Sequence, residues 1–214
     1  MNRKDYILFD LDGTLTDPKE GITKSVQHAL EHFGIQTDDL DSLTPFIGPP
    51  LRDSFKRYYG FSDEQAWEGV QAYREYFSVR GWVQNKEYPG IKEMLEALKE
   101  AGRVLLVATS KPEEFAKKIL DHFDMAEYFD FIGGADMGEI RYVLEQCGLE
   151  SDNETIGRCV MVGDREHDVL GARECGMECV GVLYGYGDRQ EMDACRPAWI
   201  AETVKDLRDL LLSL

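Results

Sequence analysis

The stretch Tyr6-Ile7-Leu8-Phe9-Asp10-Leu11-Asp12-Gly13-Thr14 sets two carboxylates directly after a short apolar run. Residues 6–9 predict a buried β-strand, and Gly13 permits the sharp turn that would bring Asp10 and Asp12 to one place. A lone Asp-x-Asp is most often a solvated turn. Here the pair closes an apolar strand and is followed by Gly-Thr, which favours a functional site.

Beyond residue 90 the chain alternates between helical patterns and short apolar runs. The run at 104–108 is apolar throughout, as expected of a strand buried on both faces. Further strands are expected at 129–132, 159–162 and 178–182, and helices at 91–101, 112–122, 140–147, 168–175 and 204–212. Such alternation predicts an α/β fold with a Rossmann-like, doubly wound parallel sheet.

The segment between the first strand and this alternating region has a helical pattern. Helices are expected at 21–34, 51–59 and 63–79, with a proline-rich loop at 44–50. We therefore expect an all-helical cap over residues 17–85, inserted into a core formed by residues 1–16 and 86–214.

The composition excludes several classes of partner. A net charge of -17 over 214 residues repels nucleic acid polymers, but not a small phosphorylated metabolite whose charge a metal ion offsets. The five cysteines form no CxxC pair, which is typical of reduced thiols. No apolar run reaches the length of a membrane span or of a signal peptide core. We expect a cytoplasmic protein without a membrane partner, either a monomer or a weak dimer.

Polar side chains follow two further predicted strands at their carboxyl ends. They are Thr109, Ser110 and Lys111 after residues 104–108, and Asp164 and Asp168 after residues 159–162. Ligands of an open parallel sheet bind beyond the carboxyl ends of its strands. Residues four apart share a helix face, so Asp168 can point back toward Asp164. The sequence therefore predicts that these groups gather with Asp10.

Clustered carboxylates repel one another unless a cation joins them, and oxygen ligands with few imidazoles favour Mg²⁺. One carboxylate can attack a phosphate to form an aspartyl-phosphate, while a second protonates the leaving oxygen and later deprotonates water. Thr109, Ser110 and Lys111 would bind and neutralise the phosphate. Alternatively, Thr109-Ser110-Lys111-Pro112 is only the start of a helix.

Three motifs make the chain resemble the haloacid dehalogenase-like phosphatases over essentially its whole length. They are Asp10-Leu11-Asp12-Gly13-Thr14, Thr109-Ser110-Lys111-Pro112 and Gly163-Asp164-Arg165-Glu166-His167-Asp168. The resemblance implies a Rossmann-like core, a mobile cap and Mg²⁺. It implies that Asp10 is the nucleophile and Asp12 the acid/base. It also implies a metal bound by Asp10, the backbone carbonyl of Asp12 and Asp164. The position of Asp168 beside Asp164 favours the metal site, and an alternative is that Asp168 only orients ligands or water.

Finer matches point to one branch of that family. Leu15-Thr16-Asp17-Pro18, Phe46-Ile47-Gly48-Pro49-Pro50-Leu51 and Gly181-Val182-Leu183-Tyr184-Gly185-Tyr186-Gly187 are similar to the phosphoglycolate phosphatase-like group, and most to its bacterial 5′-nucleotidases. The resemblance implies that Gly48 and Arg52 lie on the cap loop that meets the substrate. An ordinary surface arginine is an equal interpretation of Arg52. The Tyr184-Gly187 loop either lines the substrate mouth or is a plain glycine-rich loop.

The function that these observations favour is a Mg²⁺-dependent phosphatase for a small phosphomonoester, a 5′-nucleotidase. A phosphoglycolate phosphatase is an alternative. A sugar-phosphate mutase similar to β-phosphoglucomutase is another, because it uses a similar cap and the same two aspartates. From a different class, Asp10 is the acceptor of a receiver-like signalling domain, but that hypothesis leaves Asp12, the helical insertion and the Asp164/Asp168 pair unexplained.

One departure from the family concerns its third motif, a lysine at the start of the helix after the third core strand. No lysine occurs between Lys118 and Lys205. In similar proteins several residues, including that lysine, lie between the equivalents of Gly138 and Glu139. We hypothesise that a loop is absent from the sequence at this junction, which an over-long separation there would support. With ordinary geometry, Lys111 or Arg141 has to supply the charge.

Overall fold

We describe a computed structural model of the chain, and the residues it describes are 3–134, 140–150 and 152–214. The junction between Gly138 and Glu139 lies outside them, so the hypothesis of an absent loop stays a hypothesis. The chain divides into two compact units: a core unit, Met1–Asp17 with Glu87–Leu214, and a helical unit, Pro18–Lys86. These limits lie one residue beyond the expected 16/17 and 85/86 boundaries.

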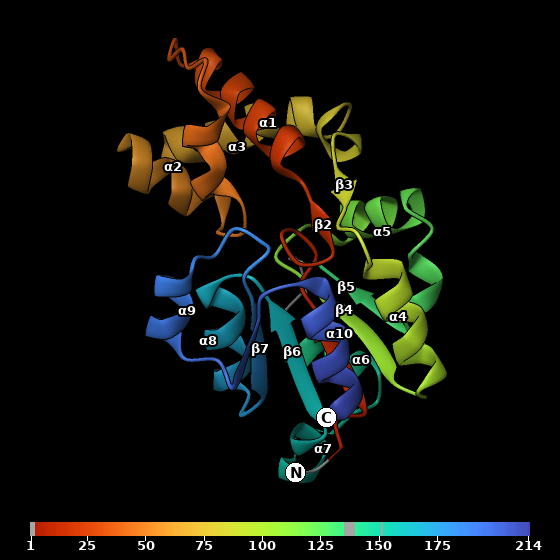
Figure 1. Cartoon of the computed structure of the whole chain (residues 1–214). Helices are drawn as coiled ribbons and strands as arrows, with labels where there is room; N and C mark the ends of the chain where they lie inside the picture. The colour runs from red at the N-terminus through yellow and green to blue at the C-terminus, as the bar shows by residue number, and fades with distance from the viewer. Residues whose placement is uncertain (1–2, 135–139, 151) are drawn as a thin grey trace. The chain divides into compact units, whose positions relative to one another are not determined.

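The core unit contains a parallel sheet whose strand order, within the described residues, is β5-β4-β1-β6-β7-β8 (Figure 1). The strands are β1 (Tyr6–Phe9), β4 (Val104–Ala108), β5 (Phe131–Gly133), β6 (Cys159–Gly163), β7 (Glu178–Val182) and β8 (Trp199–Ala201). From β1 the chain builds outward through β4 and β5, then returns to the other side of β1 for β6. The strand order therefore reverses between β1 and β6, which confirms the predicted doubly wound α/β fold.

Helices cover both faces of this sheet, as right-handed crossovers require. They are α4 (Ile91–Glu100), α5 (Glu113–His122), α6 (Ile140–Gln146), α7 (Asn153–Gly157), α8 (Glu166–Glu174), α9 (Arg189–Cys195) and α10 (Val204–Ser213), with the short η3 (Ala126–Tyr128). Leu8 and Leu106 pack with Val143 of α6 and Val169 of α8. Helices α4 and α10 lie side by side, as Figure 1 shows. No helix of the described ranges is both long and apolar enough to cross a membrane.

The helical unit packs around aromatic rings. Its elements are α1 (Lys19–His32), η1 (Leu40–Phe46), α2 (Leu51–Tyr59), α3 (Asp63–Phe77) and η2 (Gly81–Val83). Phe55 stacks on Phe61 with 5.6 Å between ring centroids, and Phe46 meets Phe55 edge-on at 5.1 Å. A reciprocal capping box between Ser62 and Gln65 starts α3. Two short strands, β2 (Thr16–Asp17) and β3 (Lys86–Glu87), pair where the chain leaves and re-enters the core unit.

Several predicted element limits differ from the structure. The strand expected at 129–132 begins at Phe131, because residues 126–128 form a 3₁₀ turn first. Helix α8 begins at Glu166 rather than 168, since the Asp168 carboxylate accepts the Arg165 N–H and caps the first turn. The short elements α7, β8, β2 and β3 were not predicted, because none is long enough to show a hydrophobic period. Helix α9 was not predicted, because its buried residues are only Met192 and Cys195.

Candidate active site

The turn after β1 is held closed by its own backbone. The Asp10 N–H donates to the Val162 carbonyl at 2.9 Å, which continues the β1–β6 pairing to the end of the strand. The Leu11 carbonyl then accepts the N–H groups of Leu15 and Thr16 at 2.9 and 3.0 Å. Gly13 has a φ of 91°, and a side chain there would collide with the Asp164 carboxylate. Glycine is therefore required between Asp12 and the facing acid.

The end of β4 brings a hydroxyl and an ammonium group to the same turn. The Thr109 hydroxyl hydrogen-bonds the Asp10 carboxylate and accepts the Lys111 N–H at 3.3 Å. The Lys111 Nζ lies 2.5 Å from Asp12 Oδ2, and both side chains are buried. Ser110, between them, is exposed. The structure thus brings Thr109 and Lys111 to Asp10 and Asp12, as the strand-end argument predicted.

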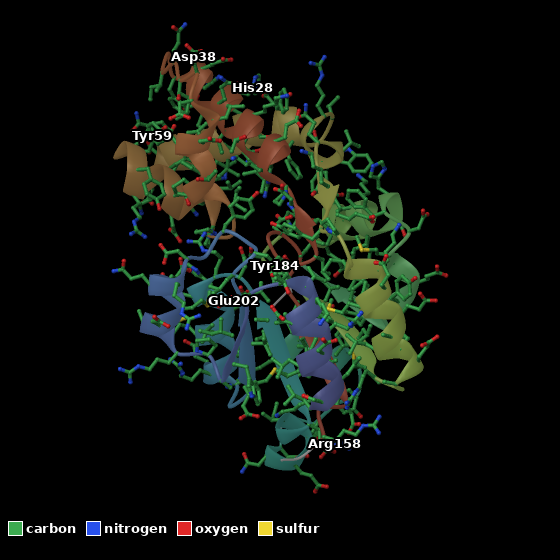
Figure 2. All side chains as sticks on the ribbon, viewed as in Figure 1. His28, Asp38, Tyr59, Arg158, Tyr184 and Glu202 are labelled. Atoms are coloured by element: carbon green, nitrogen blue, oxygen red, sulfur yellow. The ribbon has the colours of Figure 1, made fainter. Side chains whose placement is uncertain are left out.

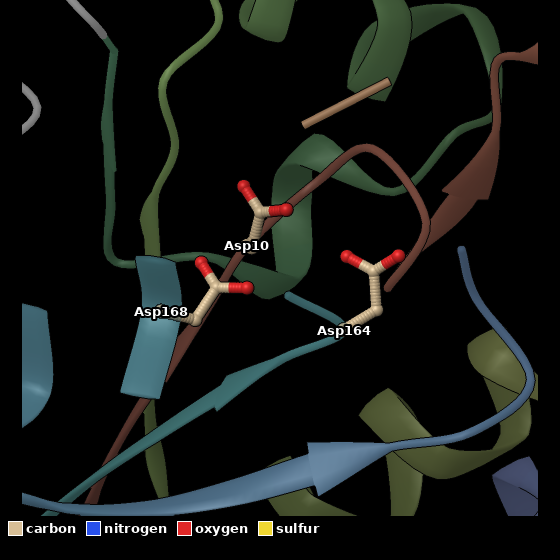
Figure 3. Close-up of side chains that lie close together, drawn as sticks. All are labelled: Asp10, Asp164 and Asp168. Atoms are coloured by element: carbon tan, nitrogen blue, oxygen red, sulfur yellow. The ribbon is translucent and has the colours of Figure 1, made fainter. Parts of the chain in front are cut away.

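The end of β6 supplies the facing carboxylates. Asp164 directly follows the strand and is fully buried, and Asp168 lies in the first turn of α8. Oxygen atoms of Asp10, Asp164 and Asp168 all lie within 4.8 Å of one another. Figure 3 shows these three carboxylates gathered beyond the strand ends. They occupy the point between β1 and β6 where the strand order reverses, which is where open α/β sheets bind ligands.

Burial of these carboxylates disfavours their charged forms. Burial raises the pKa of Asp10 well above its usual value, and the neighbouring charges of Asp168 and Asp164 add to this, while the Thr109 hydrogen bond opposes it. Burial, together with the charge of Asp168, raises the pKa of Asp164 to about 8. Burial raises the pKa of Asp168 to about 7, against the opposing hydrogen bond from Arg165. A cation bound among these carboxylates would stabilise their ionised forms.

Two carboxylate oxygens at this site are buried. Within the described residues, Oδ1 of Asp12 and Oδ1 of Asp164 are buried and have no hydrogen-bond partner. A buried carboxylate oxygen without a partner is costly, and a divalent ion with oxygen ligands would satisfy it. The cluster of Asp10, Asp164 and Asp168 therefore fits a divalent metal ion, which would also satisfy Asp164 Oδ1.

The other predicted residues lie elsewhere. Arg141 donates to the Glu174 carbonyl at the end of α8, at 3.2 Å, so Lys111 rather than Arg141 places its charge at the carboxylates. In the helical unit, Gly48 has a φ of 99° in the loop between η1 and α2. Arg52 lies on α2, half exposed, with its guanidinium 3.7 Å from Asp63. The predicted contact of Gly48 and Arg52 with substrate stays a prediction.

Sequence reasoning missed two partners of the site. The Tyr186 N–H donates to Asp164 Oδ2 at 2.6 Å. Because the donor is a backbone group, the identity of the Tyr186 side chain does not predict this contact. Glu191 accepts from the Arg165 guanidinium at 3.0 Å and from the Glu166 N–H at 2.7 Å, which holds the start of α8. For Tyr186, the available signal was a Tyr-Gly-Tyr-Gly repeat after a strand that ends on the same edge.

Comparison with known proteins agrees with this geometry. A family model described as haloacid dehalogenase-like hydrolase matches residues 7–182. A 5′-nucleotidase of Pseudomonas aeruginosa is 46% identical over 97% of this chain and 95% of its own. The tyrosine-protein kinase PtkA of Mycobacterium tuberculosis is 40% identical over 96% of this chain and 72% of its own.

Solved structures agree as well. The crystal structure of a predicted phosphatase from Clostridium acetobutylicum superposes with a TM-score of 0.93 and 43% identity, covering 100% of both chains. The expected branch and enzyme class are confirmed by these similarities to a 5′-nucleotidase and to a phosphatase. The family model covers most of the chain. The chain therefore belongs to the haloacid dehalogenase-like hydrolase family and is a phosphatase of that family.

Proposed function

We propose that this phosphatase hydrolyses a nucleoside 5′-monophosphate in a Mg²⁺-dependent reaction that passes through an aspartyl-phosphate on Asp10. The observation that carries the proposal is the meeting of Asp10, Asp164 and Asp168 within 4.8 Å, beside the Lys111–Asp12 pair. A cluster of buried acids repels a dianionic phosphate, and one ammonium group does not offset that repulsion. The site therefore binds the phosphate only when further positive charge is bound. The 46% identical 5′-nucleotidase supports the substrate class.

The chain's own groups divide the work of the first half-reaction. Asp10 attacks phosphorus with a carboxylate oxygen, so a phosphorus–oxygen bond forms to Asp10 and the bond to the leaving oxygen breaks. Asp12 gives a proton to that leaving oxygen, and the nucleoside leaves as a neutral alcohol. The Thr109 hydroxyl, which contacts the Asp10 carboxylate, keeps the nucleophile aimed at the phosphate.

In the second half-reaction Asp12 accepts a proton from water as the water oxygen attacks the phosphoryl group. The bond to Asp10 breaks, inorganic phosphate leaves, and both acids return to their starting forms. The Lys111 ammonium stabilises negative charge on the transferring group, with Ser110 at the same strand end. Asp10, the Asp12 carbonyl and Asp164 would hold Mg²⁺, which would supply the remaining positive charge, and Asp168 would orient these ligands.

A metal-dependent phosphate-release screen tests the proposal. The purified chain is assayed with nucleoside monophosphates, phosphoglycolate, sugar phosphates and pyrophosphate, with Mg²⁺ and with a chelator. We expect nucleoside monophosphates to give the highest kcat/KM and the chelator to stop release. Preference for phosphoglycolate, or transfer within a sugar phosphate, would contradict the nucleotide assignment while leaving the phosphatase class intact.

A parallel assay measures transfer of the γ-phosphate of ATP to tyrosine, because one relative bears the name of a tyrosine-protein kinase. The proposed chemistry transfers the phosphoryl group to water, so we expect no stable label on tyrosine. Stable tyrosine phosphorylation that outpaces phosphate release would contradict the proposal.

A further inference from the structure

The loop that follows β7 carries Tyr184-Gly185-Tyr186-Gly187, a repeat that the chemical steps above do not use. Its contacts lie within the core unit. The Tyr186 N–H donates to Asp164 Oδ2 at 2.6 Å. The other oxygen, Asp164 Oδ1, is buried and has no partner among the described residues. The loop thus fixes one carboxylate oxygen and leaves the second available to a ligand.

The two glycines of the repeat let the loop backbone lie directly against this acid. A side chain at Gly185 would collide with the Gly13 carbonyl and the Asp164 carboxylate, and one at Gly187 would collide with the Asp164 carbonyl. Only a residue without Cβ allows such an approach. The loop backbone therefore lies in direct contact with Asp164 and with the Gly13 carbonyl.

The two tyrosines of the repeat reach in the other direction, to the segment Thr14–Asp17. The Tyr184 hydroxyl donates to the Thr14 carbonyl at 3.0 Å, and the Tyr186 hydroxyl donates to Asp17 Oδ1. Figure 2 labels Tyr184 on this loop of the core unit. Burial raises the pKa of both tyrosines, so their hydroxyls stay protonated and remain donors.

A third tyrosine completes the cluster. The Tyr88 ring meets the Tyr184 ring edge-on at 5.1 Å, and its hydroxyl hydrogen-bonds that of Tyr186. The Tyr88 N–H also approaches the Leu15 carbonyl at 3.4 Å. Asp17 ends the segment by which the chain leaves the core unit, and Tyr88 stands directly after β3, where it returns. The loop therefore contacts both connections and Asp164.

We infer that Tyr186, supported by Tyr184 and Tyr88, is a positioning residue that directs the Asp164 carboxylate through its backbone N–H while its hydroxyl anchors the loop to Asp17. The inference rests on the proposed metal-binding role of Asp164. The physical reason is that the N–H can hold Oδ2 in place only while the loop is held, and the Tyr186–Asp17 hydrogen bond holds it. Loss of that bond lets Asp164 turn, and the metal loses a preorganised ligand.

The test compares Tyr186→Phe, Asp17→Ala and Asp17→Asn with wild type in the full-length chain. Mg²⁺ affinity is measured by calorimetry with Mg²⁺ alone, and amide hydrogen exchange of residues 12–17 is measured without metal. Tyr6→Phe is the matched control, because Tyr6 lies at the opposite end of β1 from Asp10 and its ring faces Arg158. We expect Tyr186→Phe and Asp17→Ala each to weaken Mg²⁺ binding about tenfold and to speed exchange in residues 12–17.

Two further results distinguish positioning from a general loss of stability. Asp17→Asn keeps an oxygen acceptor, so it should recover most of the Mg²⁺ affinity that Asp17→Ala loses. The double variant Tyr186→Phe with Asp17→Ala should be no weaker than either single variant, because both remove the same bond. Tyr6→Phe should change neither measurement.

The inference is overturned if Tyr186→Phe binds Mg²⁺ within about twofold of wild type, or if Asp17→Asn is as weak as Asp17→Ala. Failure of the proposed function appears differently: the wild-type chain itself would then bind no Mg²⁺ and release no phosphate. The hydrogen exchange of residues 12–17 would then still test the anchoring of the loop by Asp17. Faster exchange in Tyr186→Phe than in wild type would support the anchoring, and unchanged exchange would overturn it.

Discussion

The amino-terminal ends of the strands form one side of the central sheet, the amino edge, and their carboxyl-terminal ends form the other, the carboxyl edge. Both edges carry buried charges, but the charges are paired at the amino edge and gathered with like charges at the carboxyl edge. At the amino edge, Lys4 is buried, lies 2.7 Å from Glu178 and donates to the Gly157 carbonyl at 2.7 Å. Asp5, on the same edge, pairs with Arg158 at 2.8 Å. At the carboxyl edge, Asp10, Asp164 and Asp168 lie together, and one Asp164 oxygen has no hydrogen-bond partner among the described residues.

The difference shows which end of each strand serves stability and which serves chemistry. Lys4 and Asp5 of the amino edge pair with Glu178 and Arg158, so these two charges need no ion from solution. The carboxyl edge holds more negative charge than Lys111 can balance, so its ionised form is stable only with a bound cation. The following predictions test this contrast, in order of decreasing effect.

The largest effect is expected for Asp10→Asn. The amide is a poor nucleophile, so phosphate release should fall at least about 10⁴-fold, while the metal-free protein should unfold at an equal or higher temperature because one repelling charge is gone. Steady-state assays and thermal denaturation measure the two results. Near-normal turnover would refute the nucleophile assignment.

The two buried lysines give a direct comparison of the edges. Lys111→Met should lower kcat/KM about 10²- to 10³-fold, because its charge lies 2.5 Å from Asp12 at the reacting groups. Lys4→Met should leave kcat/KM unchanged and reduce the free energy of unfolding by about 1–3 kcal/mol, through the lost hydrogen bonds. Activity assays and urea denaturation of both variants decide the matter. A loss of activity in Lys4→Met with unchanged activity in Lys111→Met would contradict the roles given to the two edges.

The pH dependence of stability should come from the carboxyl edge. Asp164 and Asp168 have folded-state pKa values raised to about 8 and about 7, above the unfolded value of 3.8, so the folded protein binds more protons between these limits. Stability of the metal-free protein should therefore fall as the pH rises from about 4 to about 8, by a few kcal/mol. Mg²⁺ should stabilise the protein more at pH 8 than at pH 6. Urea denaturation at each pH, with Mg²⁺ or a chelator, measures this, and Asp164→Asn should flatten the dependence. A metal-free protein that gains stability over this range would contradict the account.

The smallest effect is expected for Arg52→Ala in the helical unit. Arg52 is half exposed and lies 3.7 Å from Asp63, so its removal should cost little stability. If it contacts the substrate, KM for a nucleotide should rise about three- to tenfold with kcat nearly unchanged. Lys56→Ala, which removes a neighbouring exposed contact to Asp63, is the control. Equal KM values for both variants and wild type would remove Arg52 from the site.

The sheet and its acids could be predicted because parallel strand ends meet at one edge. Asp10, Thr109 and Asp164 each follow a buried strand directly, so their meeting follows from the alternation of strand and helix alone. Asp168 follows from its spacing of four residues. The same logic does not give the partner of Lys111, because the carboxylate that a lysine reaches depends on the closed turn at residues 11–16.

Other features lay beyond sequence reasoning for a different reason. The Tyr186 N–H is a backbone group, and every residue but proline has one, so the Tyr-Gly-Tyr-Gly repeat indicates a loop at this edge but not which carboxylate its N–H binds. Helix α9 buries only Met192 and Cys195, strand β8 is too short to show a period, and β2 and β3 pair only two residues each. Contacts of this kind become visible only once the chain is folded.

The most direct test of the central claim is to acid-quench the enzyme during turnover of a nucleoside monophosphate with Mg²⁺ and to map its peptides by mass spectrometry. We predict one phosphoryl group on the peptide that contains Asp10, absent from Asp10→Asn and absent when a chelator is added. Rapid turnover with no phosphoryl group on Asp10, or the same modification without any divalent metal, would contradict the account.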